Sequence, residues 1–98
     1  MRFRKYRGMR LTYEQQGLVF FLCRNYRKLP REQQKKIIRL CQMVGRNNPY
    51  ALFLLLTTDR SVQSLMAQFK LASESTLYEA RNSFYREWYA EEEQHEKS

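Results

Sequence analysis

The order of apolar and polar residues along the chain predicts five helices. Apolar residues recur at intervals of three and four within segments rich in Gln, Glu, Lys, Arg, Leu and Ala, which are residue types that favour helices. This spacing predicts helices over about 12–29, 30–44, 49–58, 61–69 and 74–89. We therefore expect an all-α fold, a compact bundle of about five helices.

The residues at the predicted boundaries agree with these ranges. Thr12 is followed three residues later by Gln15, which is the spacing of a capping box. Gly45 is expected to end the second helix. The other helices are preceded or opened by residues suited to a helix start, namely Pro30, Pro49, Asp59 or Ser61, and Ser73 or Ser75.

One helical domain is expected over residues 11–90, with the two-helix segment at about 60–88. A flexible basic arm over 1–10 precedes it, and an acidic frayed tail over 91–98 follows it. With 98 residues and 43% hydrophobic content, the chain has enough apolar surface for a core. The predicted core consists of Leu18, Phe21, Leu22, Ile37, Ile38, Cys41, Leu52, Phe53, Leu56, Leu65, Phe69, Leu77, Phe84 and Trp88.

The residues that usually carry enzyme chemistry do not form a pattern. Cys23 and Cys41 stand alone in apolar helical segments, which predicts buried thiols rather than a zinc or redox site. His95, the one histidine, lies in the acidic tail without companion ligands. We therefore expect neither an enzyme nor a bound cofactor or metal. The longest apolar run, residues 50–56, is far shorter than the roughly 20 residues that cross a bilayer, so a cytoplasmic protein is expected.

The net charge of +8 is distributed unevenly along the chain. Residues 1–46 hold thirteen Lys or Arg and two Glu, so their charge is 13 − 2 = +11. Residues 47–98 hold five basic and eight acidic residues, so their charge is 5 − 8 = −3. A strongly basic half attracts polyanions, and both nucleic acid and an acidic protein surface fit this description.

The segment 61–84 is similar to the helix-turn-helix of bacterial and phage DNA-binding proteins. Ala67 matches the small residue in the middle of the first helix, and "SESTLY" resembles the S-x-x-T-V-Y run that opens many recognition helices. Leu77 and Ala80 match the apolar anchors of that helix. The chain departs from the family at the turn, where the favoured glycine is absent and Lys70, Leu71 or Ala72 takes its place.

The resemblance implies that the helix 74–89 reads the major groove of DNA. Its face opposite Leu77 and Phe84 carries residue types that contact bases, and we expect base reading by Ser75, Thr76, Tyr78, Glu79, Asn82 and Arg86. Phosphate binding is expected from the basic residues of the first half, namely Arg2, Arg4, Lys5, Arg7, Arg10, Arg31, Lys35, Lys36 and Arg39. A solvated helix face is the alternative interpretation, because the carboxylates of this helix outnumber its arginines and repel phosphate.

Three functions follow from these patterns. The first is a small sequence-specific DNA-binding protein, a transcription regulator of phage or mobile-element type. It would bind double-stranded DNA as a homodimer through the C-terminal aromatic residues Phe84, Tyr85, Trp88 and Tyr89, or together with a second protein. The second is a helical protein-binding adaptor or inhibitor that docks its basic surface on an acidic partner. RNA binding through the basic arm is the third.

Overall fold

The protein is an all-α bundle of five helices. The computed structural model describes residues 10–96, with side chains to residue 91, and no strand occurs in this part of the chain. The elements are α1 (Tyr13–Arg24), the short 3-10 helix η1 (Tyr26–Lys28), α2 (Arg31–Val44), α3 (Pro49–Thr57), α4 (Val62–Phe69) and α5 (Glu74–Glu96). Residues 1–9, which hold most of the predicted basic arm, lie outside the described residues.

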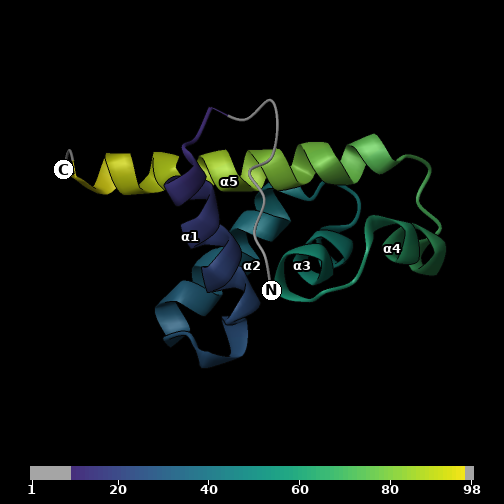
Figure 1. Ribbon diagram of the computed structural model, residues 1–98, viewed down its shortest axis with the longest axis horizontal. Helices are drawn as coiled ribbons and strands as arrows, with labels where there is room; N and C mark the ends of the chain where they lie inside the picture. Colours follow the sequence, from purple (N-terminus) through teal and green to yellow (C-terminus); the bar gives the residue numbers. More distant parts are fainter. Residues whose placement is uncertain (1–9, 97–98) are drawn as a thin grey trace.

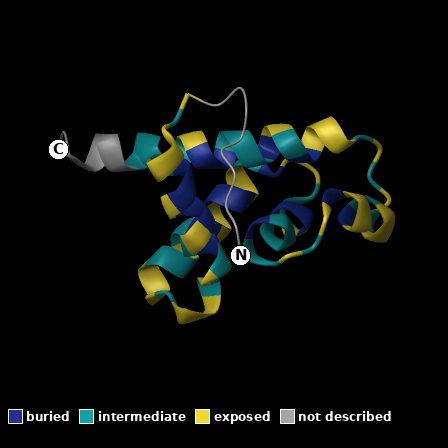
Figure 2. Cartoon of the chain, in the orientation of Figure 1, coloured by how far each residue is buried: buried dark blue, intermediate teal, exposed yellow. Residues whose placement is uncertain are grey.

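The long helix α5 runs along one side of the molecule, and the other four helices pack against it (Figure 1). At about 1.5 Å per residue, its 23 residues span about 35 Å, which accounts for most of the longest extent of the molecule, 42 Å. Helix α3 is central, because it contacts each of the other four helices. Figure 2 shows buried residues along the side of α5 that faces the bundle.

The core has two parts. The larger one joins α1, α2, α3 and α5, and it includes the fully buried side chains of Phe84, Tyr85 and Trp88. The smaller one joins α3, α4 and the start of α5 through Ala51, Val62, Leu65 and Leu77. Each part requires residues from α3 and α5, so these two helices hold the halves of the bundle together.

The helix starts are those that the sequence predicts. The Thr12 hydroxyl accepts a hydrogen bond from the Gln15 backbone N–H, and the Gln15 side chain accepts one from the Thr12 N–H, which confirms the capping box. At α4 the cap is Ser61 rather than Asp59, since its hydroxyl accepts from the Ser64 N–H. The Ser73 hydroxyl accepts from the N–H of Ser75 at the start of α5.

The predicted rotation of α1 was wrong by about one residue. Leu18 and Phe21 are 53% and 47% exposed, whereas Val19 and Phe20 are buried. Residues 18–23 form an unbroken apolar run, so the pattern alone does not decide which side is covered. The side of α1 that faces the core is the one that carries Gln16, and the buried side-chain amide of Gln16 donates a hydrogen bond to the Leu11 carbonyl.

Two further predictions about the core and the tail were also wrong. Ile38 is 40% exposed on α2, and Leu40 is buried in its place beside Ile37. Helix α5 does not end near residue 90 but continues to Glu96. The longer helix adds turns beyond Trp88, and these include Glu91, which forms an ion pair with Arg39 of α2.

Both cysteines are free and buried, as their apolar surroundings predict. Burial raises the pKa of Cys23 far above its ordinary value, and it raises the pKa of Cys41 to about 12. A thiol becomes a nucleophile or a metal ligand only as the thiolate. Cys23 and Cys41 are therefore packing residues of the core.

Replacing Gly45 by Ala is expected to destabilise the junction between α2 and α3. A Cβ atom at this position would lie 2.4 Å from the Cys41 carbonyl oxygen and 2.6 Å from the Pro49 Cα, and both of these are backbone atoms. We expect the free energy of unfolding to fall by about 1 to 3 kcal/mol, a typical cost of overpacking. Urea denaturation measures this, and an unchanged midpoint would mean that the junction yields without cost.

Candidate nucleic-acid interface

Helices α4 and α5 and the turn between them, residues 70–73, form one unit, which we call the α4–α5 unit. Lys70 ends α4 in the left-handed conformation, with φ 54° and ψ 46°. The backbone N–H groups of Lys70 and Leu71 both donate to the Met66 carbonyl and close the turn. Lys70 therefore occupies the position where glycine is the usual residue.

The start of α5 is held firmly in this unit. Leu77, one turn into the helix, is buried against Ala51 of α3 and against Val62 and Leu65 of α4. On the surface, the Gln63 side-chain amide donates to the Glu74 carboxylate at 3.1 Å. The first turns of α5 therefore have a fixed position relative to α3 and α4.

Four of the six predicted base-reading residues are exposed on α5: Ser75, Thr76, Glu79 and Arg86. The other two, Tyr78 and Asn82, are half-buried, so their predicted exposure was wrong. Tyr78 packs against the smaller core, and the Arg81 guanidinium lies 5.0 Å from the centre of its ring. Arg81 also donates to the Asn82 side-chain oxygen at 3.4 Å.

The buried face of α5 is also wider than predicted, because it includes Tyr85. With 100° per residue, Tyr85 lies at the edge of the apolar face of α5, next to Tyr78 around the helix. Tyr85 is only 1% exposed and belongs to the larger core, in which α5 meets α1, α2 and α3. The covered arc of α5 is therefore wider than the one that Leu77, Phe84 and Trp88 define.

The basic residues of α2 lie away from the exposed start of α5. Lys36 donates to the Trp88 carbonyl at 3.3 Å, and its amine lies 3.8 Å from the centre of the Trp88 ring. Both terminal guanidinium nitrogens of Arg39, Nη1 and Nη2, donate to the Glu91 carboxylate, and this contact raises the pKa of Arg39. Trp88 is twelve positions beyond Thr76, a separation of about 18 Å along the helix.

The predicted phosphate-binding residues therefore fall into two groups among the described residues. Arg10, Arg31 and Lys35 are exposed. Lys36 and Arg39 make contacts with α5 that a phosphate would have to displace. The structure does not bring the α2 cations together with the base-reading face.

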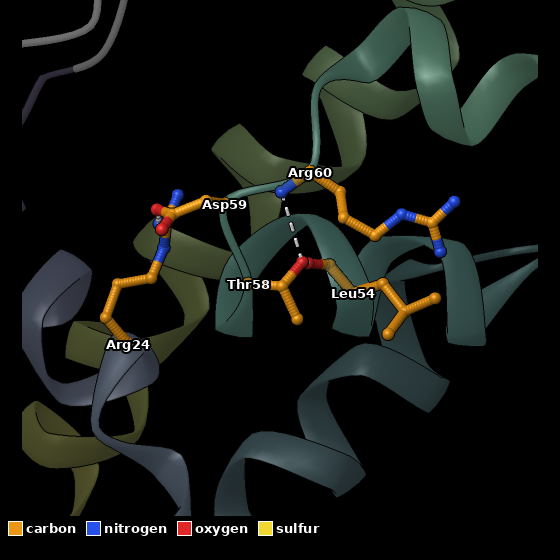
Figure 3. Close-up of polar contacts among 5 residues, drawn as sticks. All are labelled: Arg24, Leu54, Thr58, Asp59 and Arg60. Carbon is orange, nitrogen blue, oxygen red and sulfur yellow. Dashed lines mark hydrogen bonds and ion pairs between the residues drawn. The ribbon is translucent and has the colours of Figure 1, made fainter.

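Two other cations adjoin α4, and neither of them was among the predicted phosphate-binding residues. Lys70 is exposed at the turn, and Arg60 precedes the cap of α4. Figure 3 shows Asp59 turned toward Arg24 of α1, with which it forms an ion pair, while the Arg60 side chain extends away from this pair. The Arg60 backbone N–H donates to the Thr58 hydroxyl at 3.3 Å. The sequence could have pointed to Arg60 and Lys70, because they lie close before and directly after the predicted helix 61–69.

Arg60 and Lys70 make the segment from Arg60 to Trp88 slightly basic. Residues 60–88 hold four basic residues, Arg60, Lys70, Arg81 and Arg86, and three acidic ones, Glu74, Glu79 and Glu87, so their net charge is 4 − 3 = +1. The whole α4–α5 unit, residues 62–96, holds three basic and seven acidic residues, so its net charge is 3 − 7 = −4. Strong attraction to phosphate requires further cations from elsewhere in the chain.

The C-terminal aromatic residues do not provide the expected surface for a homodimer. Phe84, Tyr85 and Trp88 are each at most 2% exposed, and Tyr89 is half-buried with its hydroxyl donating to the Gln15 carbonyl. Among residues 10–91, the large apolar side chains that are exposed lie on other helices: Tyr13, Leu18 and Phe21 on α1, Ile38 and Met43 on α2, and Tyr50 on α3.

Comparisons with models of protein families, with curated proteins and with solved structures found no match to this chain. Among the described residues, no group of three or more His, Cys, Asp and Glu side chains is placed to hold a metal ion. None of the helices in the described part of the chain is long and apolar enough to cross a membrane.

Proposed function

We propose that this protein is a small sequence-specific DNA-binding protein, a transcription regulator of phage or mobile-element type that acts in the cytoplasm. The observation that carries the proposal is the exposed start of α5. It follows a four-residue turn, packs on α3 and α4 through Leu77, and presents Ser75, Thr76 and Glu79 to solvent. A helix held in this way resembles the second helix of a helix-turn-helix, which enters the major groove.

The exposed side chains suit the edges of base pairs. Ser75 and Thr76 have hydroxyls that donate to or accept from any base, and Glu79 accepts from the amino group of cytosine. Arg86 lies further along the same face and pairs with guanine or with a phosphate. Lys70 and Arg60, which lie directly after and before α4, would supply cations for the phosphates beside the groove.

A unit of this size reads only a few base pairs. Useful specificity therefore requires a second copy of the chain or a second protein on adjacent DNA. With the C-terminal aromatic residues in the core, such a contact would use the exposed apolar residues of α1, Leu18 and Phe21.

Glu79 distinguishes a reading helix from a solvated helix face. If Glu79 accepts from a cytosine, Glu79→Ala will weaken binding to a preferred duplex by about 1 to 3 kcal/mol, while binding to random duplex stays equal or strengthens because a repelling carboxylate is gone. The matched control is Glu32→Ala, which removes an exposed carboxylate from α2. Titrations with both duplexes measure the effect, and stronger binding of the Glu79→Ala protein to both would remove Glu79 from the reading face.

Lys70→Gly is expected to lower DNA affinity without lowering the stability of the protein. Glycine accepts the left-handed conformation without steric cost, so the free energy of unfolding should stay the same or rise by up to about 1 kcal/mol. DNA affinity should fall with the loss of one phosphate contact, and the slope of log affinity against log salt should fall by about 0.9.

Arg46→Gly is the matched control for Lys70→Gly. Arg46 also has a positive φ, 53°, and it is an exposed cation in the connection between α2 and α3, outside the α4–α5 unit. The two variants lose the same charge and the same backbone strain. Equal salt slopes for both variants would show that Lys70 contributes only to the overall charge.

A further inference from the structure

Two open hollows adjoin each other, one between α2 and α3 and the other at the end of α1, and we call the pair the groove. The two hollows share Tyr50 and Phe53. The larger one, about 660 Å³, is lined by Arg24, Asn25, Tyr26, Arg27, Lys28, Leu54, Thr57 and Thr58 in addition to the shared pair. The smaller one, about 410 Å³, is lined further by Ile38, Cys41, Gln42 and Pro49.

The walls of the groove are apolar and already in place. Tyr50 is 58% exposed and Ile38 is 40% exposed, which are high values for large apolar side chains. The Tyr50 ring stacks on Phe53 at 6.4 Å, and it meets Phe69 of α4 edge-on at 5.7 Å. A ring held between two others has little freedom left to lose when a ligand covers it.

The charged residues that line the groove are all basic and lie at one end of it. Arg27 and Lys28 of η1 are exposed at the end that lies next to α1. The nearest acidic residue in sequence to these walls, Asp59, forms its ion pair with Arg24. None of the residues that line the two hollows is acidic, so this end of the groove favours an anionic ligand.

We infer that this groove binds an acidic amphipathic segment of a partner protein. The apolar side chains of the segment would cover Tyr50, Phe53 and Ile38, and its carboxylates would meet Arg27 and Lys28. An amphipathic helix seated in an apolar groove is a common form of peptide recognition. The proposal is independent of DNA binding, because the groove is formed by α2, α3 and the end of α1, whereas the reading residues lie on α5.

A nucleic acid fits the groove less well than such a segment. Each nucleotide brings a phosphate that requires a cation or a hydrogen-bond donor. The smaller hollow offers Ile38, Pro49, Tyr50 and Phe53 with Gln42 as its one long polar side chain, and its lining contains no Lys or Arg. The cations are at one end only, which suits a peptide whose charged and apolar residues are separated.

The test begins with a display library of random 16-residue peptides, selected on the full chain at about 150 mM salt, where weak non-specific attraction between charges is screened. We expect enriched peptides to carry two or three large apolar residues at helical spacing and a net negative charge. A synthetic peptide of the enriched sequence then serves as the probe. Its affinity is measured by titration against variants of the chain, in the absence of DNA.

Two variants remove the two features of the groove separately. Tyr50→Ala should weaken the peptide by about tenfold or more, as expected for an aromatic anchor. The double variant Arg27→Glu, Lys28→Glu changes only exposed side chains, so it leaves the fold intact, and it should weaken the peptide by about three- to tenfold with a loss that shrinks at high salt. Met43→Ala, which removes an exposed apolar side chain outside the groove lining, should have no effect.

Several results would overturn the inference. One is a library without enrichment, and another is an enriched peptide that binds the wild-type chain and both groove variants equally. Displacement of the peptide by a single-stranded oligonucleotide but not by excess acidic peptide would assign the groove to nucleic acid. A chain that dimerises through Tyr50, with the dimer broken by Tyr50→Ala, would assign it to a second copy.

Discussion

Replacing Phe84 by Ala is expected to lower the free energy of unfolding by about 3 to 5 kcal/mol, the usual cost of removing a buried phenyl ring. Phe84 is fully buried in the larger core, with Tyr85 at 6.4 Å and Trp88 at 6.1 Å between ring centres. A domain of this size has only about 5 to 15 kcal/mol of stability in total. The variant should therefore lose a large share of its stability and unfold at a clearly lower urea concentration, which urea denaturation followed by circular dichroism measures.

Leu18→Ala is the matched control for this loss. The sequence pattern placed Leu18 in the core, but the structure exposes 53% of it on α1. We expect a loss below about 1 kcal/mol, as for most surface substitutions. A loss at Leu18 equal to that at Phe84 would contradict the observed rotation of α1.

Deleting residues 1–9 is expected to have the largest effect on DNA binding. The deletion removes Arg2, Arg4, Lys5 and Arg7, which have no acidic neighbour in the sequence. If each of them neutralises one phosphate, the slope of log affinity against log salt falls by up to about 3 to 4, at about 0.9 per contact. Stability should be unchanged, because the described core begins after residue 10.

A full-length variant with Gln at these four positions is the control for the deletion, since it keeps the length and removes the charge. The two proteins should show the same reduced slope. An unchanged slope in either protein would show that the arm does not contact DNA. Phosphate binding would then rest on the exposed cations of the described domain, such as Lys70 and Arg31.

The helix starts and the end of α2 could be predicted from the sequence because they depend on residues close together in the chain, whereas α1 ends at Arg24, earlier than predicted, and α5 continues beyond its predicted end. The Thr12 and Gln15 box, the cap at Ser61 and the end of α2 at Gly45 each involve side chains within a few positions of the backbone groups that they satisfy. The side of α1 that is buried could not be predicted in this way. Its apolar run offers several faces, and the choice depends on α3 and α5, which are distant in sequence.

In the candidate site, too, the features that depend on nearby residues could be predicted, and those that depend on residues distant in the sequence could not. The exposure of Ser75, Thr76 and Glu79 follows from the periodicity of α5 and was predicted. The engagement of Arg39 could not be predicted, because its partner Glu91 is 52 positions away and becomes available only when α5 extends past Trp88. The half-burial of Tyr78 depends likewise on packing between helices, because Tyr78 packs against the smaller core formed by α3, α4 and the start of α5.

Selection of bound duplexes from a random library at about 150 mM salt tests the proposed function most directly, since non-specific binding is weak under these conditions. We predict an enriched motif of a few base pairs, or two such motifs at a fixed spacing if two copies bind. The motif should be lost or relaxed in a variant with Ala at Thr76 and Glu79, both of which are exposed on α5. A flat selection with the wild-type chain, or a motif unchanged in the variant, would contradict the proposal that α5 reads DNA.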